Sequence, residues 1–205
     1  RYNCPEGVLQ CEEGDLAAFS AGELEGLRNG VDENYTDLIS QNGAIQNHQL
    51  GIVGGGANTR FAISGNYLSE KGVTIGQGFL RRGATGSIDH NSGRFTARLS
   101  ANVVNSLRDV NRGDGTWGEA LSISPLAPAH DENGDPLAFN TPWDAQMWNP
   151  LVDTEHRTNE QLRTRTFGNA YAGYELFDGI TLRTVFGADL SVRRDAVFLG
   201  ALTDD

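Results

Sequence analysis

The sequence has little methionine, lysine and cysteine, and it has no long hydrophobic run. One of its 205 residues is Met, and 15 of its 16 basic residues are Arg. The net charge of −11 argues against nucleic-acid binding, which needs a basic surface. No stretch approaches the roughly 20 consecutive apolar residues of a transmembrane helix, and no signal peptide is visible.

Apolar residues are also scarce, at 38% of the chain, whereas 26 residues are Gly. Low hydrophobicity is typical of disordered chains, but several segments alternate regularly between apolar and polar residues. A β-sheet with one polar face explains both observations better than disorder does.

The two cysteines, Cys4 and Cys11, lie close together near the start of the chain. In an exported protein they are candidates for a disulfide that closes a small loop, and two free thiols are the alternative. A metal-binding pair is disfavoured because no His or second Cys pair lies near them. The chain begins with Arg and ends without completing a strand, so we expect an internal fragment of a longer protein.

A strand, a glycine-rich turn and a second strand occupy residues 46–72. In the second strand, one face carries apolar and aromatic residues and the other carries polar or small ones: Phe61, Ile63, Gly65 and Tyr67 against Arg60, Ala62, Ser64 and Asn66. This period of two predicts a β-strand with one hydrophobic side. Gly54–Gly56 tolerate the backbone conformations of a tight reversal.

The same pattern recurs and predicts an all-β antiparallel up-and-down meander of about six strands. The expected strands are 44–53, 59–69, 79–89, 94–104, 163–176 and 180–190. Short helices are expected at 21–29, where Ser20 and Glu23 have the spacing of a capping box, and near 117–123. The expected organisation is a loop region with a short helix (1–42), four strands in two hairpins (43–104), a long loop (105–162), a hairpin (163–191) and the start of another loop (192–205).

Short turns alternate with long loops along this meander, which is typical of a bacterial outer-membrane barrel with long external loops. In such a barrel the polar strand face lines the lumen. The residues expected there are Arg60, Asn66, Arg81, Arg94, Arg98, Asn102 and Arg183. A soluble β-sandwich also alternates, so the pattern supports the barrel without excluding a sandwich.

No catalytic or metal-binding pattern stands out, and we expect neither an enzyme nor a cofactor. The four histidines have no ligand spacing. Asp131-x-Asn133-x-Asp135 resembles the start of a calcium loop, but Pro136 replaces the required Gly, so a solvated turn is favoured. The long loop contains candidate ligand-contacting aromatics, whose alternative role is to pack the loop or to lie in an interfacial girdle: Trp117, Trp143 and Trp148.

The ordered set of segments QNHQLGIVGGGANTRFAISGNYLSEKGV, FLRRGATGSIDH, WGEALSISPLAP and NPLVDTEHRTNEQLRTRTFGNAYAGYEL resembles the SusC/RagA family of TonB-linked outer-membrane proteins. The resemblance covers roughly residues 30–200. It implies a transporter in the bacterial outer membrane, with a plug domain inside a barrel of about 22 strands and a SusD-like surface lipoprotein as partner.

This resemblance implies that the chain is part of the barrel wall of a TonB-dependent transporter that imports bulky nutrients such as glycans or peptides. Its partners would be the SusD-like lipoprotein, the TonB energy-coupling complex acting through the plug, outer-membrane lipid and the nutrient. The chain itself contains no plug, TonB-box segment or terminal barrel strand. The alternatives are a secreted carbohydrate-binding β-sandwich and a passive porin or adhesin barrel.

Overall fold

The computed structural model describes residues 19–112, 115–140 and 144–203. The chain divides into two compact units. The sheet unit comprises residues 42–110 and 159–197, and the loop unit comprises the described residues within 1–41, 111–158 and 198–205. The chain thus leaves the sheet unit after residue 110 and returns to it at residue 159.

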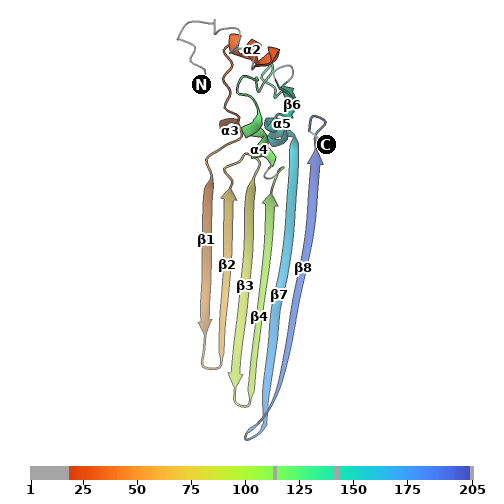
Figure 1. The fold of residues 1–205 in the computed structure, drawn as a ribbon. Helices are drawn as coiled ribbons and strands as arrows, with labels where there is room; N and C mark the ends of the chain where they lie inside the picture. The colour runs from red at the N-terminus through yellow and green to blue at the C-terminus, as the bar shows by residue number, and fades with distance from the viewer. Residues whose placement is uncertain (1–18, 113–114, 141–143, 204–205) are drawn as a thin grey trace. The chain divides into compact units, whose positions relative to one another are not determined.

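The sheet unit is a six-stranded antiparallel meander, in which the strands follow one another in sequence order (Figure 1). They are β1 (Ala44–Gly55), β2 (Thr59–Lys71), β3 (Gly78–Ser92), β4 (Phe95–Asp109), β7 (Arg157–Phe177) and β8 (Ile180–Leu199). All six expected strands are present, and the up-and-down order is confirmed. The sheet is not closed, because within the described residues the outer edges of β1 and β8 pair with no other strand.

Three short turns join the strands in hairpins at one end of the sheet (Figure 1). In the first, the N–H of Gly56 donates to the carbonyl oxygen of Thr59 at 2.7 Å. In the third, Gly179 has a φ of +85°, a backbone conformation that residues other than Gly rarely adopt. The glycines therefore fix where each strand reverses.

The strands run further than the alternation in the sequence indicates. β4 continues to Asp109 and β7 starts at Arg157, whereas the sequence placed a loop from 105 to 162. β8 continues to Leu199 instead of ending near 190. Polar and charged residues interrupt the alternation in these outer segments, but the backbone pairing continues regularly, as the partnership of Asp109 with Glu160 shows.

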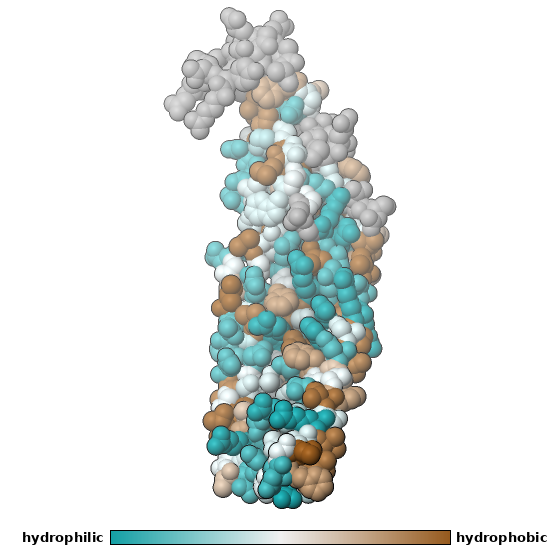
Figure 2. Space-filling view, turned by 60° about the horizontal axis from the view of Figure 1, so that its bottom comes forward, coloured by the Kyte–Doolittle hydropathy of each residue, from teal (hydrophilic) through white to brown (hydrophobic). Residues whose placement is uncertain are grey.

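The two faces of the sheet differ in character. One face, which we call the apolar face, carries aliphatic and aromatic side chains that remain exposed, including Leu50 at 74%, Ile63 at 57% and Leu99 at 53%. The opposite face, which we call the polar face, carries the alternate residues of each strand. Figure 2 shows mostly hydrophilic side chains over the middle of the visible surface, with hydrophobic ones gathered mainly towards its margins.

The loop unit contains short helices around a small core. They are α2 (Ala21–Arg28), α3 (Tyr35–Leu38), α4 (Gly115–Ser122) and α5 (Pro150–His156). Two short strands, β5 (Phe139–Asn140) and β6 (Asp144–Trp148), pair antiparallel. The core includes Tyr35, Ile39 and Leu151, and the Tyr35 hydroxyl donates to the carbonyl oxygen of Ala127 at 3.1 Å. No helix in the described ranges is long and apolar enough to cross a membrane.

Helix α2 starts with the capping box that the sequence predicts. The Ser20 hydroxyl accepts a hydrogen bond from the Glu23 N–H, and the Glu23 carboxylate accepts one from the Ser20 N–H at 2.8 Å. This backbone hydrogen bond from Ser20 is the main reason why the pKa of Glu23 lies below its ordinary value. The helix ends at Arg28, and Gly30 follows with a φ of +71°.

Candidate functional site

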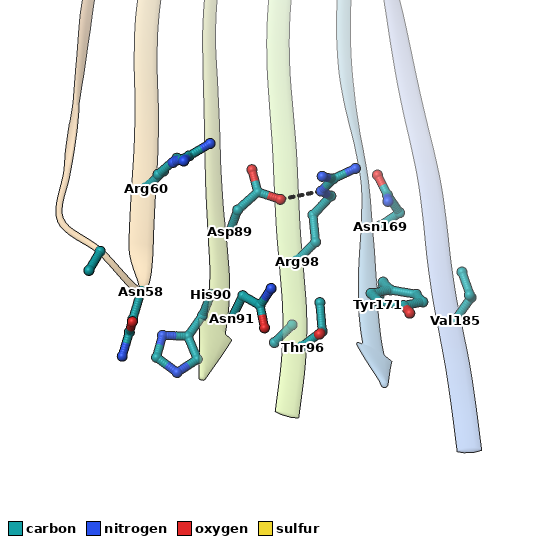
Figure 3. A pocket seen from close by; sticks show the side chains of 12 residues that line it. Asn58, Arg60, Asp89, His90, Asn91, Thr96, Arg98, Asn169, Tyr171 and Val185 are labelled. Atoms are coloured by element: carbon teal, nitrogen blue, oxygen red, sulfur yellow. Dashed lines mark hydrogen bonds and ion pairs between the residues drawn. The ribbon is translucent and has the colours of Figure 1, made fainter. Parts of the chain in front are cut away.

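A row of charged and hydrogen-bonding side chains crosses the polar face near the hairpin turns. The strand register places Arg60 of β2 opposite Asp89 of β3, Asp89 opposite Arg98 of β4, and Arg98 opposite Tyr171 of β7. Directly opposed residues point to the same side of a sheet, so all four side chains share one face. Arg98 forms an ion pair with Asp89, and Arg60 lies on the other side of the same carboxylate (Figure 3).

Further polar pairs continue this row towards the loop end of the sheet. The Ser100 hydroxyl donates to the side-chain oxygen of Asn169, and the Asn102 amide donates to the Thr85 hydroxyl. Between β7 and β8, Arg165 Nε donates to Asp189 Oδ1 at 2.9 Å, and Arg163 Nε donates to the Ser191 hydroxyl at 3.1 Å. Together these contacts form a cross-strand polar ladder on the polar face.

A cavity of about 550 Å³ opens over this row. Its lining includes Arg60, Asp89, Arg98, Asn169 and Tyr171, drawn from four neighbouring strands (Figure 3). These lining residues carry two guanidinium groups and one carboxylate, which leaves one positive charge in excess. The cavity therefore offers hydrogen-bond donors to an anionic or polar group. Its ion pair is exposed to solvent, so the pair contributes little to stability.

The other expected wall residues lie on these strands as well. The side chain of Asn66 lies over Gly83, where a Cβ atom would come within 2.8 Å of Asn66 Nδ2. Arg81 lies opposite Ser106 on the polar face. Arg94 follows the second turn, and its guanidinium lies 3.8 Å from Asp178 Oδ1. Arg183 lies on β8, six residues from Asp189, so strict alternation places it on the same face as Asp189.

Two of the three expected loop aromatics lie among the described residues, both in the loop unit. Trp117 is partly buried against the core of the loop unit. Trp148 is only 7% exposed and packs edge-on against Phe139, with ring centroids 5.0 Å apart. Trp143 lies outside the described residues. In this conformation Trp148 has almost no open ring surface on which a sugar could stack.

Cys4 and Cys11 also lie outside the described residues. Among the residues that are described, no group of three or more His, Cys, Asp or Glu side chains is placed to hold a metal ion. Asp131 accepts hydrogen bonds from the N–H groups of Asn133 and Asp135 at 2.8 and 2.9 Å, which forms the solvated turn favoured from the sequence. These donors, led by Asp135, lower the pKa of Asp131.

Sequence reasoning missed the partners of the arginines, namely Asp89, Tyr171 and Asp189, and it also missed Asn169, the partner of Ser100. A usable signal was present for Asp89. The turn after Ser92 sets the register of the hairpin, and this register brings Asp89 opposite Arg98. No comparable signal existed for residues paired across the long connection between β4 and β7, because its length does not fix a register.

Comparisons with known proteins show similarity to one class of proteins. No protein-family profile matches the chain. It is 27% identical over 198 residues to TonB-dependent receptor P3 of Formosa agariphila, an alignment that covers 87% of this chain and 20% of the receptor. It is 24% identical over 158 residues to TonB-dependent receptor P26 of the same organism, which covers 76% of this chain and 16% of that receptor.

The fold is similar to part of a solved structure, the RagAB peptide importer in the closed-closed state. The TM-score is 0.64 at 17% sequence identity, and the match covers 81% of this chain and 20% of that chain. The chain therefore spans at most about a fifth of the length of each protein that it matches.

Proposed function

Because the chain is a homologue of TonB-dependent receptors over most of its length, we propose that it forms six neighbouring strands in the wall of a barrel that imports a bulky polar nutrient. TonB-dependent receptors are transporters of the bacterial outer membrane, so the chain is assigned to that membrane and to no enzymatic activity.

The two-faced sheet is the observation that carries the proposal. Large aliphatic side chains such as Leu50, Ile63 and Leu99 stay more than half exposed on one face, while the other face holds the polar ladder. A soluble sandwich would bury the apolar face against a second sheet. A barrel wall instead places that face against lipid and the polar face towards the lumen.

The polar face is then the lumen wall, and its arginines have two roles. Arg98 and Arg165, each paired with an aspartate, hold neighbouring strands together. Arg60 and Arg81 contact carboxylates of the plug domain or of a passing substrate, together with the remaining expected wall residues Asn66, Arg94, Asn102 and Arg183. Charged and amide groups at this density suit a hydrophilic cargo, either a glycan or a peptide.

The partners follow from the same assignment. A SusD-like surface lipoprotein covers the loop end and delivers the nutrient, and the TonB complex moves the plug domain. RagAB, the structural relative, is a peptide importer, which favours a peptide over a glycan as the first substrate to test. Trp117 retains part of its surface and is the loop aromatic proposed to contact the nutrient.

The direction of the faces is tested with spin labels on two adjacent residues of β2 in the full-length protein, reconstituted in lipid vesicles. The matched variants are Ile63→Cys on the apolar face and Ser64→Cys on the polar face. We expect the label at position 63 to be relaxed mainly by oxygen, which partitions into lipid, and the label at position 64 mainly by a water-soluble nickel chelate. Equal access of the nickel chelate to both labels would contradict the barrel.

A passive porin or adhesin barrel has the same two faces and needs a separate observation. The full-length reading frame distinguishes the two, because a TonB-dependent transporter carries a plug segment before its first barrel strand. If that frame encoded no plug, the energy-coupled function would be wrong, although the assignment of the faces would remain.

A further inference from the structure

One row of the apolar face is polar from β1 to β7. The register aligns His48, Tyr67, Arg82, Asn105 and Thr164 across five strands. The rings of His48 and Tyr67 lie 6.2 Å apart, and the guanidinium of Arg82 lies 6.0 Å from the centre of the Tyr67 ring. Asn105 Nδ2 donates to the Thr164 hydroxyl at 3.0 Å.

This row stands near one boundary of the apolar surface. Beyond it, Leu80, Leu107 and Leu162 lie on the same face before the charged pair of Asp109 and Glu160. On the apolar face of β2, β3, β4 and β7, we compare the rows from that of Phe95 to that of Leu107. Within these rows Arg82 is the only Lys, Arg, Asp or Glu. Ten residues separate Phe95 from Asn105, which is about 33 Å along a strand. At a strand tilt of about 40° this becomes about 25 Å, which matches the apolar band of outer-membrane barrels.

The aromatic residues agree with this placement. Phe95 and Tyr174 are paired at the hairpin end of the band, and Tyr67 lies at the other end. Aromatic side chains are enriched where a membrane meets water, at the level of the lipid headgroups. Arg82 therefore lies at headgroup level, at the end of the sheet opposite the hairpin turns.

The surroundings of Arg82 differ from those of the arginines on the polar face. Arg98 and Arg165 each pair with an aspartate, whereas Arg82 has no carboxylate in its row. Arg82 lies beside the Tyr67 ring, as Arg165 lies beside that of Phe167. On β4, the first acidic residue of the apolar face past this row is Asp109. It lies four residues beyond Asn105, which is about 13 Å along the strand. The Arg82 guanidinium is thus oriented by Tyr67 but left without an anionic partner among the described residues.

We propose that Arg82, together with Tyr67 and His48, binds the phosphate of a lipid headgroup at the membrane interface. A guanidinium presents two parallel N–H donors that match two phosphate oxygens, while the Tyr67 hydroxyl and a His48 ring N–H supply further donors. The contact between the guanidinium and the Tyr67 ring limits the freedom of the side chain before the lipid binds. The inference rests on the proposed function, because it requires the apolar face to meet lipid.

The chain offers a matched control for this site, because Arg81 and Arg82 are adjacent and point to opposite faces. The full-length protein, purified in mild detergent, is titrated with dioleoylphosphatidylglycerol, and bound lipid is counted by native mass spectrometry. We expect Arg82→Gln to weaken the tightest lipid binding about tenfold, while Arg81→Gln leaves it unchanged. Arg82→Lys keeps the charge without the planar fork, so a smaller loss of about threefold is expected.

Two further arms identify the ligand. Dioleoylglycerol, which lacks the phosphate, is expected not to occupy the site. Inorganic phosphate, added in excess over the phospholipid, is expected not to displace it. Displacement by inorganic phosphate would assign the site to free phosphate and overturn the lipid proposal. Equal binding of phosphatidylglycerol to wild type and Arg82→Gln would also overturn it.

The spin labels at positions 63 and 64 separate this inference from the proposed function. If label 63 is in lipid but Arg82→Gln binds phospholipid as wild type does, only the phosphate site is wrong. If label 63 is in water, the barrel assignment fails, and the phosphate site fails with it. Unchanged heat-modifiable gel mobility in the Arg82 variants confirms that they fold.

Discussion

At the scale of single residues, neighbouring positions on one strand have opposite environments. Ile63 lies opposite Gly86, and the next residue across that row is Ala101, near the middle of the apolar band. Ser64 is adjacent in sequence but lies on the polar face opposite Thr85. The same chemical change at these two positions should therefore have very different consequences for stability.

We expect Ile63→Arg to destabilise the full-length protein by about 2–4 kcal/mol, because the guanidinium must enter the lipid-facing band near its centre. Ser64→Arg should cost less than about 1 kcal/mol, since the polar face already holds arginines. Urea-dependent folding into detergent micelles or lipid vesicles measures both free energies. Equal losses in the two variants would show that the two faces meet the same solvent.

At the scale of secondary-structure elements, helix α2 shows how far a local pattern decides a structure. Ser20 and Glu23 satisfy each other's backbone N–H groups, and the helix begins where this spacing predicts. We expect Ser20→Ala to cost about 1 kcal/mol of local helix stability, and so to speed amide exchange in α2 about fivefold. Glu25→Gln, an exposed change on the same helix, is the control and should leave exchange unchanged.

The same helix should weaken in acid. The pKa of Glu23 in the folded chain lies below its ordinary value of 4.5, chiefly because its carboxylate accepts the Ser20 backbone hydrogen bond. A lowered folded pKa means that the carboxylate stabilises the helix above the unfolded pKa and that this contribution is lost as the pH falls through the folded one. Amide exchange in α2, corrected for its intrinsic pH dependence, should therefore accelerate below about pH 4.5. In Glu23→Gln this acceleration should be absent.

The sequence predicted the strands and turns because alternation and glycine are local signals. The alternation at Phe61, Ile63 and Tyr67 and the reversal near Gly93 both appear in the structure. The outer ends of β4, β7 and β8 were missed because outside the apolar band no face has to be hydrophobic, so pairing continues without a pattern. Helix α5 was also missed, although Asn149 followed by Pro150 at the first helical position is a readable start signal.

The candidate site was predicted only in part, for a physical reason. Alternation tells which residues share a face within one strand, which identified Arg60 and Arg98. The pairing of strands across the long connection depends on contacts between distant residues, so Tyr171 could not be placed beside Arg98. The burial of Trp148 against Phe139 depends in the same way on a short pair of strands that has no alternation of its own.

At the scale of the whole molecule, the open sheet is the main constraint. β1 and β8 each present an edge of backbone N–H and C=O groups that pairs with nothing in the described residues. In lipid such groups must be hydrogen-bonded within the protein, and in water an exposed flat edge promotes aggregation. A wall segment of this kind is therefore stable only when further strands close the barrel on both sides.

The two unpaired edges predict different behaviour for this chain and for the full-length protein. Produced alone and refolded in detergent, residues 1–205 should aggregate and show no shift in gel mobility between heated and unheated samples. The full-length protein should show that shift, because a closed barrel resists unfolding by dodecyl sulfate until it is boiled. Size-exclusion chromatography with light scattering measures the association state of both. A monomeric, folded 205-residue chain in buffer without detergent would contradict the barrel and favour a soluble β-protein, since its apolar face would then have to be covered by the chain itself.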